Sequence, residues 1–265
     1  MRMMSLASGS SGNCIYIGSE STHILVDAGI SGKRIEQGLN EAGLTGRDLA
    51  GVLVTHEHND HIRGLGVLAR KYGLPIYGTA GTIREIGRIR QLGAFPEGIF
   101  REIAPDRDFG IGDLLVQPFS IDHDAADPVA YRVKCGNRQV AVATDMGHYD
   151  EYIISHLLDL DAALIEANHD VRMLEAGPYP YPLKKRILGD RGHLSNENSG
   201  RLISRILNDR IRHIFLGHLS AQNNYPELAY ETVRLEIDES DTPYRADNFS
   251  ISVARRDRIS ELITV

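Results

Sequence analysis

The sequence predicts an α/β protein, and two features of the chain predict it. Short apolar stretches of strand length alternate with longer stretches of helical periodicity. Four of the apolar stretches end in a titratable residue, namely Asp27, His56, Asp145 and His218. Proteins of the α/β class place their functional sites at the carboxyl ends of strands. We therefore expect these four side chains to lie at a functional edge of the fold.

The first third of the chain predicts strands followed by alternating helices and strands. Residues 13–18 and 23–26 have the length and composition of strands and are separated by a polar turn. Residues 31–44 carry apolar side chains at helical spacing, with Ser31 as the candidate N-cap. The following predicted elements are a strand at 51–55, a helix at 62–72, a strand at 75–77 and a helix at 79–92.

The rest of the chain predicts a β-rich middle and a second alternating region. Three strands are expected at 114–121, 129–135 and 139–143, with hairpin-length joins between them. After them we expect helices at 152–158, 195–207 and 226–237, and strands at 162–165, 211–216 and 249–254. Residues 177–182 contain three prolines and predict a loop. No long linker divides the chain, so we predict one domain over residues 1–265.

The composition excludes several classes of protein. Hydrophobic residues make up 42% of the 265 residues and charged residues 25%, which is ordinary for a chain that buries a core. The net charge of −7 gives no overall positive field, so a polyanion must be attracted locally or by bound metal. Cys14 and Cys135 are expected to be free and buried. We find no signal peptide and no 18-residue apolar run, and therefore expect a cytoplasmic protein without a membrane segment.

Metal-binding residue types concentrate in one short segment after the strand at 51–55. His56, His58, Asp60 and His61 offer imidazole and carboxylate groups, which are ligands for zinc and similar divalent ions. A spacing of two at a strand exit places His56 and His58 within reach of one ion. Asp60 and His61 follow after a further turn and face a second ion. Such a two-metal site is typical of hydrolases.

Two ligands do not complete a four-coordinate ion, so residues distant in sequence must supply the others. The candidates are His123, Asp145 and His218, of which the last two end apolar stretches. His193, in the loop before the helix at 195–207, is either a proton donor to the leaving group or a residue that stabilises its loop. His148 and His169 are weaker candidates for a role in the site.

Each of three further segments allows two interpretations of its role. The basic residues at 184–186 with Arg191, and those at 255–258, are either solvated surface or contacts to a phosphate backbone. The Gly- and Ser-rich loop at 8–13 is either a flexible hairpin loop or a set of backbone amides that bind a phosphate.

Taken together, these motifs resemble those of the metallo-β-lactamase fold. The pattern consists of Asp-x-Gly at 27–29, His-x-His-x-Asp-His at 56–61, His123, Thr-Asp-x-Gly at 144–147, and His218. The segments at 6–13, 123–129, 166–170, 192–196 and 217–224 resemble in particular the YycJ/WalJ-like subgroup. The resemblance implies a four-layer αββα sandwich with the metals at one rim of the two sheets.

The resemblance also implies a role for each site residue. Metal one takes His56, His58 and His123, metal two takes Asp60, His61 and His218, and Asp145 bridges the two ions. Asp27 is expected to orient the histidine loop without binding metal. We assign catalytic roles to Asp60, Asp145 and His193, and substrate contacts to Ser10, Asn13, Asn168, Ser220 and Asn223.

The predicted function is a dinuclear metal-dependent hydrolase, specifically a phosphodiesterase in which a hydroxide held between two ions attacks phosphorus. The resemblance implies a 5′-to-3′ exonuclease on DNA that is single-stranded or has a free 5′ end. The donor set suits zinc, manganese or iron. An acyl hydrolase of the same fold (a thioesterase, a lactonase or an enzyme like β-lactamase) is the main alternative, and a non-enzymatic redox or metal-sensing module is the second.

Overall fold

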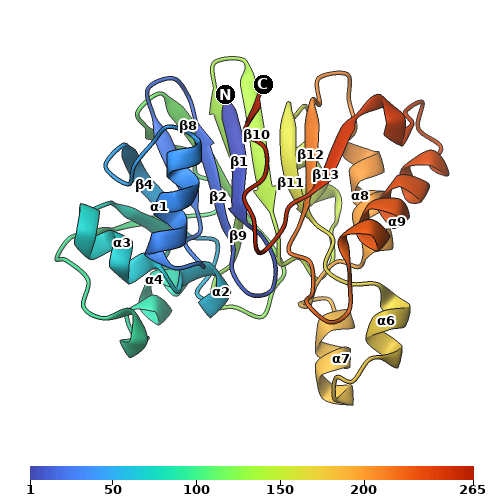
Figure 1. Ribbon diagram of the computed structural model, residues 1–265, viewed down its shortest axis with the longest axis horizontal. Helices are drawn as coiled ribbons and strands as arrows, with labels where there is room; N and C mark the ends of the chain where they lie inside the picture. Colours follow the sequence, from blue (N-terminus) through green and yellow to red (C-terminus); the bar gives the residue numbers. More distant parts are fainter.

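Two seven-stranded mixed sheets form the centre of the molecule (Figure 1), and the computed structural model describes all residues from 1 to 265. In spatial order, the first sheet contains β14 (Ile263–Thr264), β1 (Arg2–Ala7), β2 (Cys14–Gly18), β3 (His23–Val26), β4 (Leu49–Leu53), β5 (Ile76–Thr79) and β6 (Phe100–Ile103). The second contains β13 (Ser250–Val253), β12 (His213–Gly217), β11 (Ala162–Glu166), β10 (Arg138–Ala143), β9 (Val129–Cys135), β8 (Leu114–Ser120) and β7 (Phe109–Ile111).

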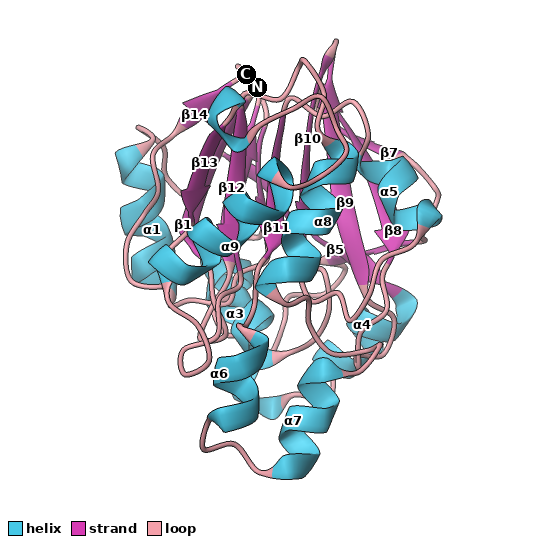
Figure 2. Ribbon diagram, turned by 90° about the vertical axis from the view of Figure 1, so that its right-hand side faces the viewer, coloured by secondary structure: helices cyan, strands magenta, loops and turns pink.

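Helices cover the outer face of each sheet (Figures 1 and 2). The first sheet is covered by α1 (Gly32–Glu41), α3 (Leu65–Tyr72) and α4 (Ala80–Ile86). The second is covered by α5 (Glu151–Leu157), α8 (Asn196–Ile206) and α9 (Pro226–Asp238). The remaining short helices are α2 (Asn59–Ile62), α6 (Val171–Ala176), α7 (Tyr181–Leu188) and the 3-10 turns η1 (Arg90–Leu92) and η2 (Ala246–Asn248). The αββα order of layers confirms the predicted fold class.

Three buried apolar layers hold these four layers of structure together. One lies between the sheets and includes Val26 and Leu53 from the first sheet and Val142 and Phe215 from the second. The other two lie between each sheet and its helices. Tyr131 of β9 also donates a hydrogen bond of 2.7 Å to the carbonyl oxygen of Val54, just after β4, which links the second sheet to the first. The sheets are thereby fixed relative to each other close to the predicted site.

The parallel strands bring their carboxyl ends to one edge of each sheet. In the first sheet, β3, β4, β5 and β6 are parallel, and in the second, β10, β11, β12 and β13 are parallel. The residues just after β3, β10 and β12 are Asp27, Asp145 and His218, with φ angles of 62°, 62° and 57°. Non-glycine residues rarely adopt this left-handed conformation, and it clusters at functional sites. The chain therefore turns sharply at three of the predicted site residues.

Several predicted boundaries differ from the structure. The helix predicted at 62–72 begins at Leu65 and is preceded by the separate turn α2, and the helix predicted at 79–92 ends at Ile86. The predicted 177–182 loop was wrong at its end, since α7 begins at Tyr181. Its first turn contains Pro182, which needs no hydrogen-bond donor there.

Other elements carried too weak a pattern to be predicted, namely β1, β6, β7, β14 and α6. Ser31 is the N-cap of α1, as predicted, and its hydroxyl accepts from the backbone N–H of Arg34. Cys14 is buried as expected, but Cys135 is only half-buried, because it ends β9 beside an exposed turn. None of the helices combines the length and the apolar character needed to cross a membrane.

Candidate metal centre

The loops after β3, β4, β8, β10 and β12 bring all seven predicted metal ligands together with Asp27. The donor atoms of His56, His58 and His123 lie within 4.8 Å of one another, and so do those of Asp60, His61 and His218. These are the two groups expected from the sequence. Asp145 lies between them. Its carboxylate oxygens are 3.2 Å from Nε2 of His61, 3.5 Å from Nε2 of His218 and 3.7 Å from Nε2 of His123.

Asp27 and Thr55 contact the imidazoles of His56 and His61 on the Nδ1 side, which faces away from the centre. Nδ1 of His61 donates to Oδ2 of Asp27 at 2.7 Å, and Thr55 donates to the same carboxylate through both its backbone N–H and its hydroxyl. Nδ1 of His56 lies 3.0 Å from the Thr55 hydroxyl oxygen. These contacts hold Nδ1 of both rings on the outer side, so that both Nε2 atoms face the centre. Asp27 thus contacts the histidine loop through His61 and Thr55, and its orienting role stays a prediction.

Glu166 lies in the second sheet at the position that Asp27 has in the first, and it was not predicted from the sequence. The buried carboxylate lies 3.0 Å from Nδ1 of His218 and 2.8 Å from Nδ1 of His193, and it accepts the backbone N–H of Met146 at 2.9 Å. The signal was present in the sequence, because Glu166 ends the apolar stretch of β11 just as Asp27 ends that of β3. His123 is oriented differently, since its Nδ1 lies 3.1 Å from the carbonyl oxygen of Gly192.

The electrostatics of the centre set which of its donors are ionised. Burial lowers the pKa of His218, but the carboxylates of Asp145, Asp60 and Glu166 outweigh burial and raise it to about 10. Burial also works against ionisation of Asp145, yet His218 and His61 hold the pKa of this carboxyl well below its usual range. Burial and the neighbouring His61 lower the pKa of His56 well below its ordinary value. Asp145 is therefore ionised and His56 neutral at physiological pH.

The donor set fits divalent metal ions. Nε2 of His56 and Oδ2 of Asp145 are buried and have no hydrogen-bond partner, although such atoms are normally satisfied. Nε2 of His123 and Nδ1 of His58 face each other at 3.2 Å. A convergence of nitrogen lone pairs and carboxylate oxygens is costly when buried alone, and cations compensate for it. These clusters therefore support divalent metal binding.

His193 lies beside the donors, as its candidate role requires. Its side chain is 18% exposed, and Nδ1 lies 2.8 Å from Glu166 and 3.6 Å from Asp145. Its ring centroid is 5.2 Å from that of His123 and 5.3 Å from that of His218. A proton held on Nδ1 by Glu166 leaves Nε2 as the atom that can exchange protons within the site. His193 therefore has the geometry of an acid–base group.

The five residues assigned to substrate contact differ in exposure. Ser10 is exposed, whereas Asn13, Asn168, Ser220 and Asn223 are buried. The Asn13 amide accepts the backbone N–H of Gly9 and lies 3.1 Å from Nε2 of His61, and the Asn168 amide donates to the carbonyl oxygen of His218 at 2.8 Å. Asn13 and Asn168 thus hold loops that carry metal donors. Contact of these five residues with a substrate stays a prediction.

The two weaker histidine candidates lie in different environments. His148 is exposed and pairs with Asp122 at 3.4 Å. His169 is buried, neither of its ring nitrogens has a hydrogen-bond partner, and burial lowers its pKa to about 4. Neither residue belongs to a group of potential metal donors.

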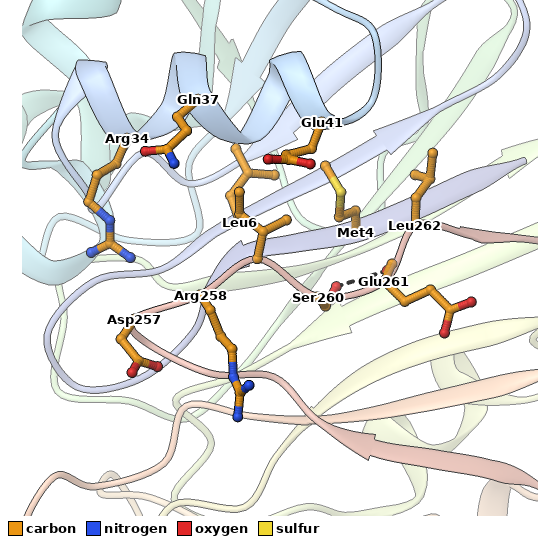
Figure 3. A pocket seen from close by; sticks show the side chains of 11 residues that line it. Met4, Leu6, Arg34, Gln37, Glu41, Asp257, Arg258, Ser260, Glu261 and Leu262 are labelled. Carbon is orange, nitrogen blue, oxygen red and sulfur yellow. Dashed lines mark hydrogen bonds between the residues drawn. The ribbon is translucent and has the colours of Figure 1, made fainter.

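A separate hollow lies between α1 and the segment before β14 (Figure 3). Its lining includes Arg34 and Glu41 of α1 and Asp257 and Arg258 of that segment. None of the predicted site residues lines it. The chemistry expected from the sequence is therefore confined to the edge where the strands end.

Comparisons with known proteins agree with this geometry. The family described as a β-lactamase superfamily domain matches residues 22–218. Exodeoxyribonuclease YycJ of Bacillus anthracis is 41% identical over 236 residues, which cover 88% of this chain and 88% of that protein. Exodeoxyribonuclease WalJ of Streptococcus pneumoniae serotype 2 is 40% identical over 236 residues, covering 89% of this chain and 88% of that protein.

A solved structure supports the fold independently. Zn²⁺-bound PqqB from Methylobacterium extorquens matches with a TM-score of 0.72 at 16% identity, covering 98% of this chain and 100% of that chain. At this identity the likeness concerns the fold alone. The family match and the extended identity confirm the resemblance drawn from the motifs. The chain therefore belongs to the metallo-β-lactamase superfamily, and within it to the subgroup of the exodeoxyribonucleases YycJ and WalJ.

Proposed function

We propose that this protein is a metal-dependent exodeoxyribonuclease that works with two divalent ions. The observation that carries the proposal is that six donors form two groups of three, with the ionised Asp145 between the groups as the seventh donor. The relatives named exodeoxyribonuclease, which are 40–41% identical over nearly nine-tenths of the chain, favour a phosphodiester in DNA as the bond that is cut.

The first ion would be held by His56, His58 and His123, the second by Asp60, His61 and His218, and Asp145 would contact both. When bound, two such ions supply a nucleophile at neutral pH and neutralise the charge on the phosphate oxygens. The protein itself orients the donors through Asp27, Thr55 and Glu166. Because these orienting groups are buried, the site is formed before the substrate arrives.

We assign to His193 the proton that the leaving oxygen needs. Glu166 accepts from its Nδ1, which fixes the orientation of the ring. Nε2 can then hold a proton and donate it to the departing sugar oxygen. Replacement of His193 by alanine should slow turnover without removing metal. His193 also clusters with Asp145, Glu166 and His218, but its Nδ1 is bonded to Glu166 and it belongs to neither of the two predicted ligand groups.

The test uses the purified full-length chain and single-stranded DNA labelled at the 5′ end or at the 3′ end. We expect nucleotide release that stops with a chelator and returns when zinc, manganese or iron is added. The variants His58→Ala and Asp145→Ala should lose this release while their circular dichroism spectra stay native. Release of the 5′ label before the 3′ label would establish the 5′-to-3′ direction. Wild-type rates in either variant would refute the assigned centre.

The acyl hydrolase alternative is tested with the same preparation. A thioester panel and nitrocefin offer carbonyl substrates to the same donors. Turnover of these substrates without release of nucleotides would replace the nuclease proposal with the alternative. A metal-sensing role predicts no hydrolysis of either class, and in that case Asp60→Ala would change no activity.

A further inference from the structure

Two short helices, α6 and α7, extend away from the sandwich at the end of the molecule where α2 lies (Figures 1 and 2). We call residues 171–191, which contain both helices, the arm. Its only buried residues are Leu174 and Ile187, so the arm contributes little to either core. Most side chains of this projection face solvent, where they can contact another molecule.

The arm differs from the rest of the protein in charge. It carries five basic residues and two acidic residues, in a chain whose net charge is −7. The basic residues are Arg172, Lys184, Lys185, Arg186 and Arg191. Local positive charge on an acidic protein attracts a polyanion to that place and not to the surface in general.

The exposed face of α7 combines this charge with an aromatic ring. Tyr181 is 77% exposed, more than any other exposed large hydrophobic side chain of the protein. It lines a groove together with Lys184, Lys185 and Leu188. Stacking of bases on aromatic rings beside cations that follow the backbone is how proteins bind single-stranded nucleic acid without reading its sequence.

The base of the arm is bonded directly to the metal centre. The Arg191 guanidinium donates to the carbonyl oxygen of His123 at 2.8 and 3.1 Å, and Arg186 pairs with Asp124, the next residue. The backbone N–H of His193 donates to the carbonyl oxygen of Ile187, in the last turn of α7, at 3.0 Å. Tyr181, at the other end of α7, lies about 9 Å along the helix axis from Ile187.

We propose that the arm is the binding surface for the single-stranded DNA that continues beyond the bond being cut. Tyr181 stacks against a base, and Lys185 contacts a backbone phosphate. This inference rests on the proposed nuclease function, because it names where the rest of the same substrate lies. Lys184 is a less suitable probe, since its ammonium also donates to the carbonyl oxygen of Glu175.

The experiment compares two arm variants with two matched controls in the full-length enzyme. Tyr181→Ala and Lys185→Ala should each raise the KM for a 12-nucleotide single strand about 10-fold and leave kcat within about twofold. Lys185→Ala should also weaken the dependence of DNA affinity on salt by about 0.7 in log–log slope. Turnover of bis(p-nitrophenyl) phosphate, which is too short to reach the arm, should not change.

The controls distinguish loss of the aromatic ring from loss of the tyrosine hydroxyl, and loss of a cation in the arm from loss of a cation elsewhere. Tyr181→Phe keeps the ring and should retain the wild-type KM. Arg212→Ala removes an exposed cation at the amino end of β12, the end opposite His218, and should leave the KM unchanged although it alters net charge as Lys185→Ala does. An unchanged KM in both arm variants, or an equal rise in Arg212→Ala, would overturn the proposal.

A second readout separates this inference from the nuclease proposal. The anisotropy of a fluorescein-labelled 12-nucleotide single strand reports binding in the presence of chelator, where no cleavage is expected. Binding that weakens in Tyr181→Ala supports the arm even if the wild type cleaves no DNA, a result that would refute only the nuclease proposal. Cleavage by the wild type with unaltered binding and KM in both arm variants would refute only the arm.

Discussion

The two sheets contribute the same turn to the metal centre, but they use it differently. Asp27-Ala28-Gly29 follows β3 and Asp145-Met146-Gly147 follows β10, and both aspartates have a φ of 62°. In each case the glycine lies against another loop of the site. A Cβ added to Gly29 would lie 1.6 Å from the carbonyl oxygen of Asp60, and one added to Gly147 would lie 2.1 Å from that of Asp190.

The difference between the two aspartates lies in their hydrogen bonds. The carboxylate of Asp27 accepts hydrogen bonds from the backbone N–H and hydroxyl of Thr55 and from Nδ1 of His61. Oδ2 of Asp145 has no hydrogen-bond partner. Its carboxylate faces the Nε2 atoms of three histidines, with Oδ2 toward His61 and Oδ1 toward His123 and His218. A satisfied carboxylate orients a ligand, whereas an unsatisfied one can bind a cation. In the second sheet the orienting task is taken by Glu166 instead.

The largest effect should come from replacing the unsatisfied aspartate. Asp145→Ala removes the donor between the two groups, and we expect a loss of DNA hydrolysis of about 1,000-fold or more. Asp27→Ala leaves all seven donors in place and should weaken metal affinity about 10- to 100-fold. Turnover at saturating metal and metal titration with elemental analysis separate the two outcomes. Equal losses that persist in both variants at saturating metal would show that the hydrogen-bond difference does not decide the role.

The next effect tests whether Glu166 is the counterpart of Asp27. Glu166→Gln weakens the hold on His218 and His193 at once, so metal affinity should fall about 10- to 100-fold. At saturating metal a remaining loss of kcat should persist, because His193 is still poorly oriented. His193→Ala measures the contribution of His193 alone. It should lower kcat about 100-fold or more with metal content unchanged. Full recovery of Glu166→Gln at high metal would leave His193 without a role in turnover.

The comparison also shows which parts of the site the sequence can predict. Asp27, His56, Asp145 and His218 were predictable because each ends an apolar stretch, and a strand end is a local property of the chain. The pairing of His123 with one group and His218 with the other came from the family resemblance, since it depends on how two sheets stack. Glu166 had the same local signal but was not selected, because a buried glutamate reveals its role only through its partners.

Prediction of the fold from the sequence was likewise limited to elements with a strong local pattern. Strands and helices with strong periodicity, such as β12 and α8, were predicted closely, whereas β6 and β7 were missed. In β6 the middle residues are exposed, so its sequence lacks the apolar run that marked the other strands. Residues 177–182 of the arm were predicted as a loop because they contain prolines at 178, 180 and 182. The helix α7 nevertheless begins at Tyr181, between the last two of these prolines.

The two turn glycines should differ in their effect on stability. Gly29→Ala places a methyl group against the backbone of Asp60 and should lower the free energy of unfolding by about 3 kcal/mol or more, and Gly147→Ala by about 2–3 kcal/mol. Urea denaturation followed by circular dichroism measures both. Gly87→Ala is the control, since its φ is −62° and the nearest atoms to an added Cβ lie 3.5 Å away. Wild-type stability in Gly29→Ala would show that the close contact with Asp60 does not constrain the turn.

The smallest effect concerns Asp161, a buried carboxylate at the opposite end of β11 from Glu166. It accepts from Arg138 at 2.8 Å, from Arg210 at 2.9 Å and from the backbone N–H of Gln139 at 2.9 Å. Burial alone would raise its pKa, but these donors lower it below the usual value. All the donors are protein groups, so this carboxylate resembles Asp27 in being satisfied but lies away from the predicted metal ligands.

Asp161→Asn should therefore affect stability and not turnover. Because the folded pKa is lower than the unfolded one, the stabilisation is present above about pH 4 and is lost as the pH falls through the folded pKa. We expect the variant to be about 1–2 kcal/mol less stable than wild type at pH 7, with the difference shrinking below about pH 4. Urea denaturation from pH 7 to pH 3 measures this trend. A difference that stays constant with pH would mean that the charge of Asp161 does not stabilise the fold, and an altered kcat would mean that the two ends of the second sheet are coupled.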